Sequence, residues 1–192
     1  MRKIKYVIFL AALIILSGRF LYAEDLDKKF HSKEEVKFSI HLGRAYDYTD
    51  ILVTRAVDGD TLKLENGERV RLIGIDTPEM HESNKLFRDA KRTNQDIKTI
   101  KDLGQRSYEF TRRLVEGKRV SLEFDVEGQD RYGRLLAYVY LKDGTFVNAE
   151  IVKQGYASLM TIPPNVKYAD TFVKLYREAR EGGKGLWAVD KQ

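Results

Sequence analysis

The chain has 192 residues, no cysteine and a formal net charge of +5. This length corresponds to about one domain, and the 43% hydrophobic and 11% aromatic residues suffice for a packed core, which excludes a generally disordered chain. The lack of cysteine excludes disulfides, a Cys-ligated zinc or iron–sulfur centre and a thiol nucleophile.

The first 23 residues differ in character from the rest of the chain. A basic start precedes an 11-residue apolar run from Tyr6 to Leu16, and Ala23 stands directly before an acidic pair. This layout predicts a signal peptide over residues 1–23, because the run is shorter than the roughly 20 residues that span a bilayer. An uncleaved membrane anchor over residues 4–23 is the alternative. Either one predicts a secreted or periplasmic protein.

The leader also explains most of the net charge. It holds four basic residues and no acidic one, which leaves 30 basic and 29 acidic residues in the rest of the chain. Bulk basicity is therefore no indication of a nucleic-acid partner. Residues 82–120 are a local exception, with 11 basic against six acidic residues.

The central part of the chain has the pattern of short strands. Residues 24–49 are polar with mixed charge and are interpreted as a linker or arm. Strands are then predicted at residues 51–57, 61–64 and 69–73. Asn66-Gly67 between the second and third is a strong hairpin signal, because both residues tolerate positive φ.

Helices and two more strands follow. Leu103, Ser107, Phe110 and Leu114 recur at helical spacing, and Gly117 is expected to end that helix. Further strands are predicted at 120–124 and 135–141. Asn148 is expected to cap a short helix that reaches Gly155, and a last helix is expected from Tyr168 to Ala179, before Gly182-Gly183.

Five short strands, with a helix between the third and the fourth, predict a mainly β fold with helices. The strand count is that of a five-stranded OB-type barrel with about three packed helices and an extra helical insertion; a five-stranded sandwich is the alternative. The folded domain is predicted to cover residues 50–188.

Carboxylates and arginines stand at the ends of the predicted strands. Each has an ordinary structural explanation in a turn or on a solvated face, but together they form a set that suits chemistry. Hard oxygen ligands can bind Ca²⁺ or Mg²⁺, guanidinium groups can hold a phosphate, and a glutamate can act as general base. The set indicates metal-assisted phosphodiester hydrolysis. Its members are Asp58, Asp60, Arg71, Asp76, Glu79 and Arg134.

Several separated motifs resemble the staphylococcal nuclease (thermonuclease) family of OB-fold nucleases. The resemblance runs from about Ile51 to Trp187, with the motifs in the family's order. The matching segments are Val57-Asp58-Gly59-Asp60-Thr61, Arg71-Leu72-Ile73-Gly74-Ile75-Asp76-Thr77-Pro78-Glu79, Asp130-Arg131-Tyr132-Gly133-Arg134-Leu135-Leu136-Ala137-Tyr138, Val147-Asn148, Gln154-Gly155-Tyr156-Ala157 and Gly185-Leu186-Trp187.

The resemblance implies a role for each site residue. Asp60, Asp76 and the Thr77 carbonyl would bind Ca²⁺, and Arg71 and Arg134 would bind the scissile phosphate. Glu79 would activate the attacking water, and Tyr132 and Arg131 would contact the substrate. Family members cleave the bond to the 5′ oxygen of DNA and RNA. Little sequence specificity is expected, because backbone phosphate carries no base information. A monomer is expected.

Two segments depart from the family pattern. No tyrosine follows Ala157 until Tyr168, although the family places tyrosines there to hold the nucleotide. The segment 80–103 is longer than in the type member and has a helical period over Leu86, Ala90, Thr93, Ile97 and Ile100. Its basic residues form either a solvated helix face or an extra wall that contacts nucleic acid.

Two other functions remain open at this stage. The same barrel can be a non-catalytic nucleic-acid or protein-binding module, and a single-strand binder is a more distant possibility. The complete acid and base set favours a calcium-dependent nuclease.

Overall fold

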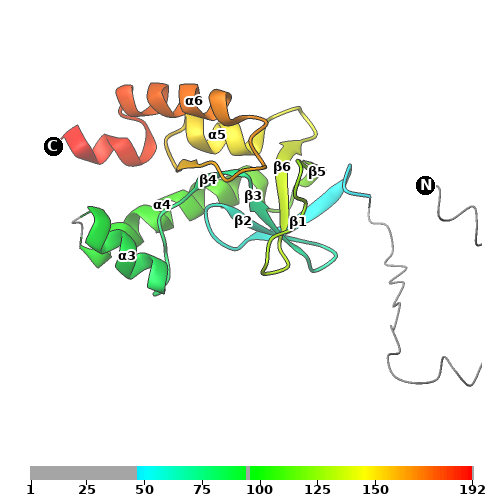
Figure 1. Ribbon diagram of the computed structural model, residues 1–192, viewed down its shortest axis with the longest axis horizontal. Coiled ribbons are helices and arrows are strands. Elements are labelled where there is room, and N and C mark those ends of the chain that lie inside the picture. Colours follow the sequence, from blue (N-terminus) through cyan, green and yellow to red (C-terminus); the bar gives the residue numbers. More distant parts are fainter. Residues whose placement is uncertain (1–46, 94–95, 192) are drawn as a thin grey trace, which may run out of the picture. The chain divides into compact units, whose positions relative to one another are not determined.

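The computed structural model describes residues 47–93 and 96–191 (Figure 1). The predicted signal peptide or anchor at 1–23, and the predicted arm up to residue 46, lie outside the described residues. Among the described helices, none combines the length and the apolar character that crossing a membrane requires.

The centre of the domain is a closed five-stranded barrel with the order β1-β2-β3-β6-β5. All neighbouring strands are antiparallel except β3 and β6, which are parallel, with Val70 opposite Leu135 and Arg71 opposite Leu136. The predicted OB-type barrel is confirmed, and the sandwich alternative is wrong. The strands are β1 (Ile51–Ala56), β2 (Thr61–Leu64), β3 (Arg69–Leu72), β5 (Arg119–Glu123) and β6 (Leu135–Leu141).

The chain leaves the barrel at Gly74 and forms a separate two-stranded ribbon. Strand β4 (Gly74–Asp76) pairs antiparallel with β7 (Ser158–Met160), a pairing that the sequence analysis did not predict. Gly74 has a φ of +84°, and a Cβ there would lie 2.4 Å from the Phe172 ring. The change of direction carries Asp76 and the residues after it away from β3.

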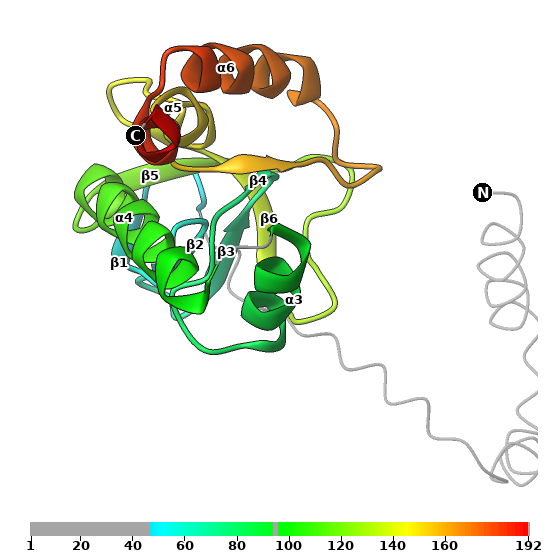
Figure 2. The ribbon, with the colours of Figure 1, turned by 90° about the vertical axis from the view of Figure 1, so that its left-hand side faces the viewer.

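Within the described residues, four α-helices and a 3₁₀ helix accompany the barrel (Figures 1 and 2). Helices α3 and α4 pack on each other, α4 also contacts β1, and α5 contacts β6 and packs under α6. The insertion is helical, as predicted. The helices are α3 (Asn84–Thr93), α4 (Ile97–Val115), α5 (Val147–Lys153), α6 (Ala169–Glu181) and η1 (Gly185–Lys191).

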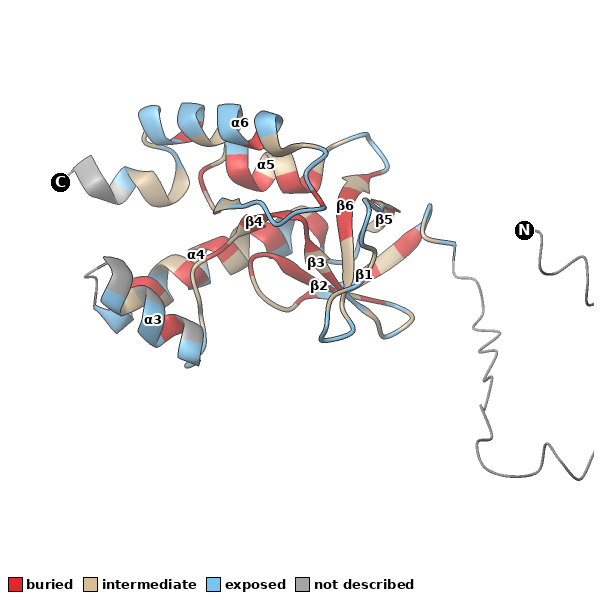
Figure 3. Cartoon of the chain, in the orientation of Figure 1, coloured by how far each residue is buried: buried red, intermediate tan, exposed pale blue. Residues whose placement is uncertain are grey.

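The main core fills the barrel and the space between the barrel and the inner faces of the helices (Figure 3). Tyr138 and Phe172 are the largest of the fully buried side chains. Tyr138 also makes edge-on contacts with Tyr168 and Phe146. Aromatic side chains therefore join β6 to α6.

The helix predicted from the spacing of Leu103, Ser107, Phe110 and Leu114 is confirmed as α4. Its buried face consists of Ile100, Gly104, Ser107, Thr111 and Val115, whereas Leu103, Phe110 and Leu114 are only partly buried. Polar and small residues thus take the inner positions, because they meet backbone of other segments.

Asn148 is not a helix cap. It is the second residue of α5, and its buried side chain accepts a hydrogen bond from the Val139 amide and donates one to the Ile73 carbonyl. The side chain joins β6 to the chain segment that leaves β3 for the ribbon. The prediction was wrong because a capping preference is local, whereas this role depends on distant backbone.

The described end of the arm lies against the barrel. The Tyr48 carbonyl accepts a hydrogen bond from the Leu122 amide, and its hydroxyl donates to Glu68 at 2.7 Å. The Tyr48 ring also packs edge-on against Phe124. Residues 47–49 thus extend the contacts of β5 at the entry to the domain.

Candidate functional site

An open cavity of about 610 Å³ lies where β3, the β4–β7 ribbon and the turn before β6 meet. All of the strand-end carboxylates and arginines singled out from the sequence line it, together with Arg131 and Tyr132. Thr77 lies beside them, hydrogen-bonded to Asp60. The set that the sequence predicted is therefore gathered in one place.

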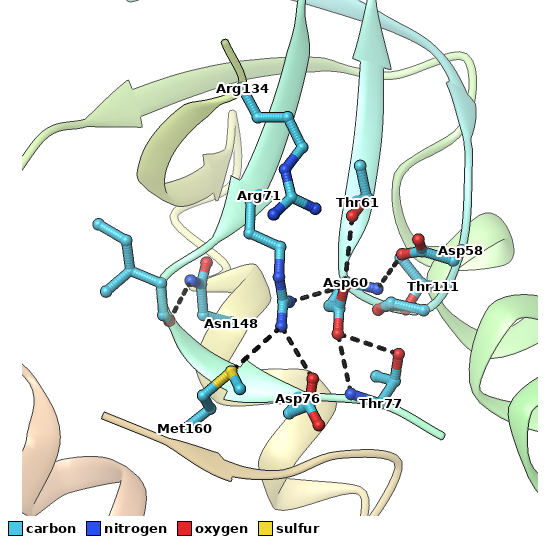
Figure 4. A network of polar contacts seen from close by, with 12 residues as sticks. Asp58, Asp60, Thr61, Arg71, Asp76, Thr77, Thr111, Arg134, Asn148 and Met160 are labelled. Atoms are coloured by element: carbon cyan, nitrogen blue, oxygen red, sulfur yellow. Dashed lines mark hydrogen bonds and ion pairs between the residues drawn. The ribbon is translucent and has the colours of Figure 1, made fainter. Parts of the chain in front are cut away.

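Arg71 on β3 lies between two carboxylates (Figure 4). Its Nη1 atom is 2.6 Å from Asp60 Oδ1, and its Nη2 atom donates to Asp76 Oδ1 at 3.0 Å. Only 13% of the Arg71 side chain is exposed, so these contacts form with little competition from water. One guanidinium thus holds the carboxylates of two chain segments close together.

The turn between β1 and β2 fixes the position of Asp60. Its amide donates to Asp58 Oδ1 at 2.9 Å, and its Oδ2 atom accepts from the amide and the hydroxyl of Thr77. A Cβ at Gly59 would lie 2.7 Å from the Thr77 hydroxyl, so only glycine allows this approach. The turn and the segment after β4 are therefore tightly joined.

Negative charge is in excess at this end of the cavity. Asp58, Asp60 and Asp76 line it with Arg71. Burial, and next the negative charge of Asp60, raise the pKa of Asp58 to about 7. An additional positive charge would be favourable here.

Arg134 also lines the cavity, and its guanidinium extends toward the same space as that of Arg71 (Figure 4). Its Nε and Nη2 atoms contact Asp130 Oδ2 at 2.8 and 2.7 Å. The other oxygen of Asp130 accepts from the backbone amides of Tyr132 and Arg134. Asp130 therefore organises the turn and orients the arginine.

The pKa of Asp130 is shifted in the opposite direction to that of Asp58. Partial burial opposes its ionisation, but hydrogen bonds from the Arg134 backbone and side chain outweigh burial and lower the pKa of Asp130. The negative charge of the Asp130 carboxylate and the positive charge of the Arg134 guanidinium cancel each other. This part of the cavity needs no further charge to be stable.

Tyr132 stands at the mouth of the cavity and is 69% exposed. The Arg131 and Arg134 guanidinium carbons lie 4.8 and 5.6 Å from its ring centroid, and Arg131 donates to its hydroxyl at 2.7 Å. Both predicted substrate contacts are thus at the surface, next to Arg134.

The part of the cavity wall that follows Ala157 is aliphatic rather than aromatic. Met160 and Ile162 line the cavity after Ala157, where the sequence lacks the tyrosines of the family. Met160 Sδ lies 3.7 Å from Arg71 Nη2, and Ile162 is 61% exposed. Aliphatic surface is therefore available where a nucleotide is expected.

The insertion lies outside the cavity wall. Among the described residues, those that line the cavity include none from α3 or α4. Arg88, Lys91 and Lys98 are exposed. This arrangement favours the interpretation of the insertion as a solvated face.

The donor set fits a hard divalent cation, although no group of three or more His, Asp or Glu side chains within the described residues is gathered tightly enough to mark a metal centre. Carboxylate oxygens of Asp60 and Asp76 meet at one guanidinium, which shows that they can share a positive partner. Oxygen donors and excess negative charge suit Ca²⁺. Asp60 and Asp76 are the residues able to hold it.

Sequence reasoning missed two residues that position others. Asp130 stood inside a quoted motif without a role, although an aspartate at the start of a tight turn is a signal for a side chain that accepts the backbone amides of that turn. Thr111, whose hydroxyl donates to the Gly59 carbonyl at 2.8 Å, carried no signal in the sequence.

Comparison with known proteins agrees with this geometry. The family described as staphylococcal nuclease homologue matches residues 69–189. Thermonuclease of Staphylococcus intermedius is 37% identical over 71% of this chain and 74% of its own. Thermonuclease of Staphylococcus hyicus is 31% identical over 95% of each chain. The SPbeta prophage-derived endonuclease YokF of Bacillus subtilis is 35% identical over 74% of this chain and 45% of its own. The chain therefore belongs to the staphylococcal nuclease homologue family.

Proposed function

We propose that this protein is a calcium-dependent nuclease that hydrolyses phosphodiester bonds of DNA and RNA with little sequence specificity. The observation that carries the proposal is the cavity that gathers Asp60, Arg71, Asp76, Glu79 and Arg134. The names of its relatives, thermonuclease and endonuclease, support the same reaction.

The two arginines are the proposed phosphate ligands. They approach the cavity from β3 and from the turn before β6, and a phosphate between them would have guanidinium groups on two sides. Asp130 occupies the Nε and Nη2 atoms of Arg134, so its remaining Nη1 atom is the donor offered to a substrate. Donors fixed in advance stabilise the charge that develops on the phosphoryl oxygens.

Glu79 is the proposed general base. It lies on the loop between β4 and α3 and lines the cavity with the two arginines. Its carboxylate would take a proton from water as the water oxygen bonds to phosphorus, while the bond from phosphorus to the 5′ oxygen breaks. The departing 5′ oxygen would take up a proton from solvent water, so the products would be a 3′-phosphate and a free 5′ hydroxyl.

Asp60, Asp76 and the Thr77 carbonyl are the proposed ligands of Ca²⁺. Bound calcium would supply a Lewis acid for the phosphate oxygens. The carboxylates themselves are held in place by the Thr77 amide and by Arg71, so this chain prepares the ligands before any cation binds.

Substrate contacts beyond the phosphate are proposed for Tyr132 and Arg131 at the mouth of the cavity. Phosphate contacts alone do not distinguish bases, which is why little sequence preference is expected. Export through the N-terminal segment, cleaved or retained as an anchor, and a monomeric state belong to the same proposal.

The test uses the full chain with plasmid DNA and RNA, in Ca²⁺ and then in chelator. We expect calcium-dependent cleavage of both, and a loss of at least about a hundredfold in rate for Glu79→Gln. Glu178→Gln on the exposed side of α6 is the matched control and should cleave normally. Binding of DNA without cleavage would instead assign the chain as a non-catalytic module.

A further inference from the structure

Helix α4 approaches the backbone of the loop that carries Glu79 at one small residue, Gly104. Gly104 is buried on this helix, and a Cβ built there would lie 2.7 Å from the carbonyl carbon and oxygen of Glu79 and 2.8 Å from the amide of Met80. Real Cβ atoms essentially never approach other atoms so closely. The obstructing atoms are backbone, which cannot rotate away as a flexible side chain can.

The same face of the helix contacts the turn that carries Asp60. Thr111 is fully buried, and its hydroxyl donates to the Gly59 carbonyl at 2.8 Å. It lies seven residues after Gly104, which is about two helical turns or 10 Å along the axis. One rigid helix therefore contacts backbone in both of these segments.

We infer that helix α4 sets the separation between Glu79 and the Asp58–Asp60 turn, with Gly104 and Thr111 as positioning residues. Gly104 allows the helix to approach the Glu79 peptide, and Thr111 anchors the turn. Neither Gly104 nor Thr111 lines the cavity, so each acts through the chain segment that it positions. This inference rests on the proposed function, because it concerns the roles of Glu79 and Asp60.

The physical reason for a positioning role is the sensitivity of catalysis to geometry. A displacement of about 1 Å at a reacting group can cost roughly a hundredfold in rate. A methyl group at position 104 has to displace the Glu79 peptide, because the helix is held by its other contacts. Alanine has a higher helix propensity than glycine, so the helix itself gains by the same substitution.

The first experiment is a double-mutant cycle on the full chain, with single-stranded DNA and saturating Ca²⁺. We expect Gly104→Ala to lower kcat by roughly ten- to a hundredfold with KM within about threefold of the wild type. In the Glu79→Gln background the same substitution should change kcat by less than about threefold, because the residue through which it acts is already disabled. Gln105→Ala, exposed on the same helix, is the matched control and should leave the rate unchanged.

The second experiment measures calcium binding by calorimetry. Thr111→Val keeps the side-chain shape but removes the hydrogen bond to the Asp58–Asp60 turn. We expect calcium affinity to fall by about three- to tenfold, the loss that one hydrogen bond corresponds to. Gly104→Ala should leave calcium affinity unchanged, because it acts on the other segment.

Several results would overturn the inference. They are a wild-type kcat in Gly104→Ala, an equal loss of rate with and without Glu79, unfolding of Gly104→Ala in circular dichroism, or unchanged calcium affinity in Thr111→Val. Unfolding counts against it because the loop, rather than the fold, should absorb the displacement. A normal rate in Glu79→Gln would instead contradict the proposed function, so the two failures are distinguishable.

Discussion

The two arginines of the cavity are held in different ways. Arg71 lies between Asp60 and Asp76, in a region where Asp58 adds a third carboxylate and has a raised pKa. Among the described residues, Arg134 pairs with one carboxylate, that of Asp130, whose pKa is lowered, and it also lies against the Tyr132 ring. The first region has too much negative charge for its one guanidinium, whereas the second is balanced.

This difference assigns separate tasks to the two regions. Excess negative charge makes the Arg71 region receptive to a cation, and the carboxylates there have a second potential partner. In the second region, Asp130 already orients the Arg134 guanidinium as a hydrogen-bond donor, so this region needs no bound cation to keep its geometry. We therefore expect calcium to affect the first region and not the second.

The largest expected effect comes from removing each arginine. Arg71→Gln and Arg134→Gln should both lower kcat by roughly a hundred- to a thousandfold, because each removes a donor to the transition-state charge. Their stabilities should differ. In chelator, Arg71→Gln should melt below the wild type, because two partly buried carboxylates lose their cation.

Calcium separates the two variants further. A ligand that binds only the folded state raises the melting temperature, and the carboxylates of Arg71→Gln have no competing guanidinium. We expect calcium to raise the melting temperature of Arg71→Gln by more than that of the wild type, and that of Arg134→Gln by the wild-type amount. Equal calcium shifts in both variants would remove the distinction between the regions.

An intermediate effect is expected from the positioning carboxylate of the second region. Asp130→Asn keeps the shape but weakens the charge-assisted contacts to Arg134, so kcat should fall by about ten- to a hundredfold while calcium affinity is unchanged. Asp143→Asn is the matched control, since Asp143 also accepts an amide hydrogen bond in a tight turn but is exposed and does not line the cavity. Steady-state kinetics and calorimetry measure both quantities.

The smallest expected effect concerns pH and Asp58. Its pKa is about 7 in the folded chain and 3.8 as a free side chain, so the stability it contributes is complete below pH 3.8 and is lost as pH rises through 7. Asparagine cannot ionise. In chelator at pH 8, Asp58→Asn should melt about 3–6 °C above the wild type, which corresponds to roughly 1–2 kcal/mol. The difference should vanish near pH 4; the same difference at both pH values would contradict the charge excess.

Most of the barrel was predictable from the sequence. Strands β3 and β5 alternate in burial, and Asn66-Gly67 marks the β2–β3 hairpin, so local patterns sufficed. The β4–β7 ribbon was not predictable, because β7 has three residues and none of them is fully buried. Short strands without a buried face leave no period in the sequence.

The members of the site were predictable, but the way in which they are held was not. Separated motifs named Asp60, Arg71 and Arg134, and the fold brings all three to one cavity. The close approach of Gly104 to the Glu79 peptide depends on the packing of a helix on a loop. The sequence shows that a helix contains a glycine, but it does not show which backbone segment packs against that glycine.

The parallel pairing of β3 with β6 has a consequence for folding. Arg71 lies on one of these strands and Arg134 directly precedes the other, and the paired residues Val70 and Leu135 are far apart in the chain. Parallel strands require a long crossover, whose closure entropy is paid before the contact forms. A chain in which only the β2–β3 hairpin has formed would hold Arg71 without Arg134 beside it, so the joint placement of the two arginines depends on closure of the barrel.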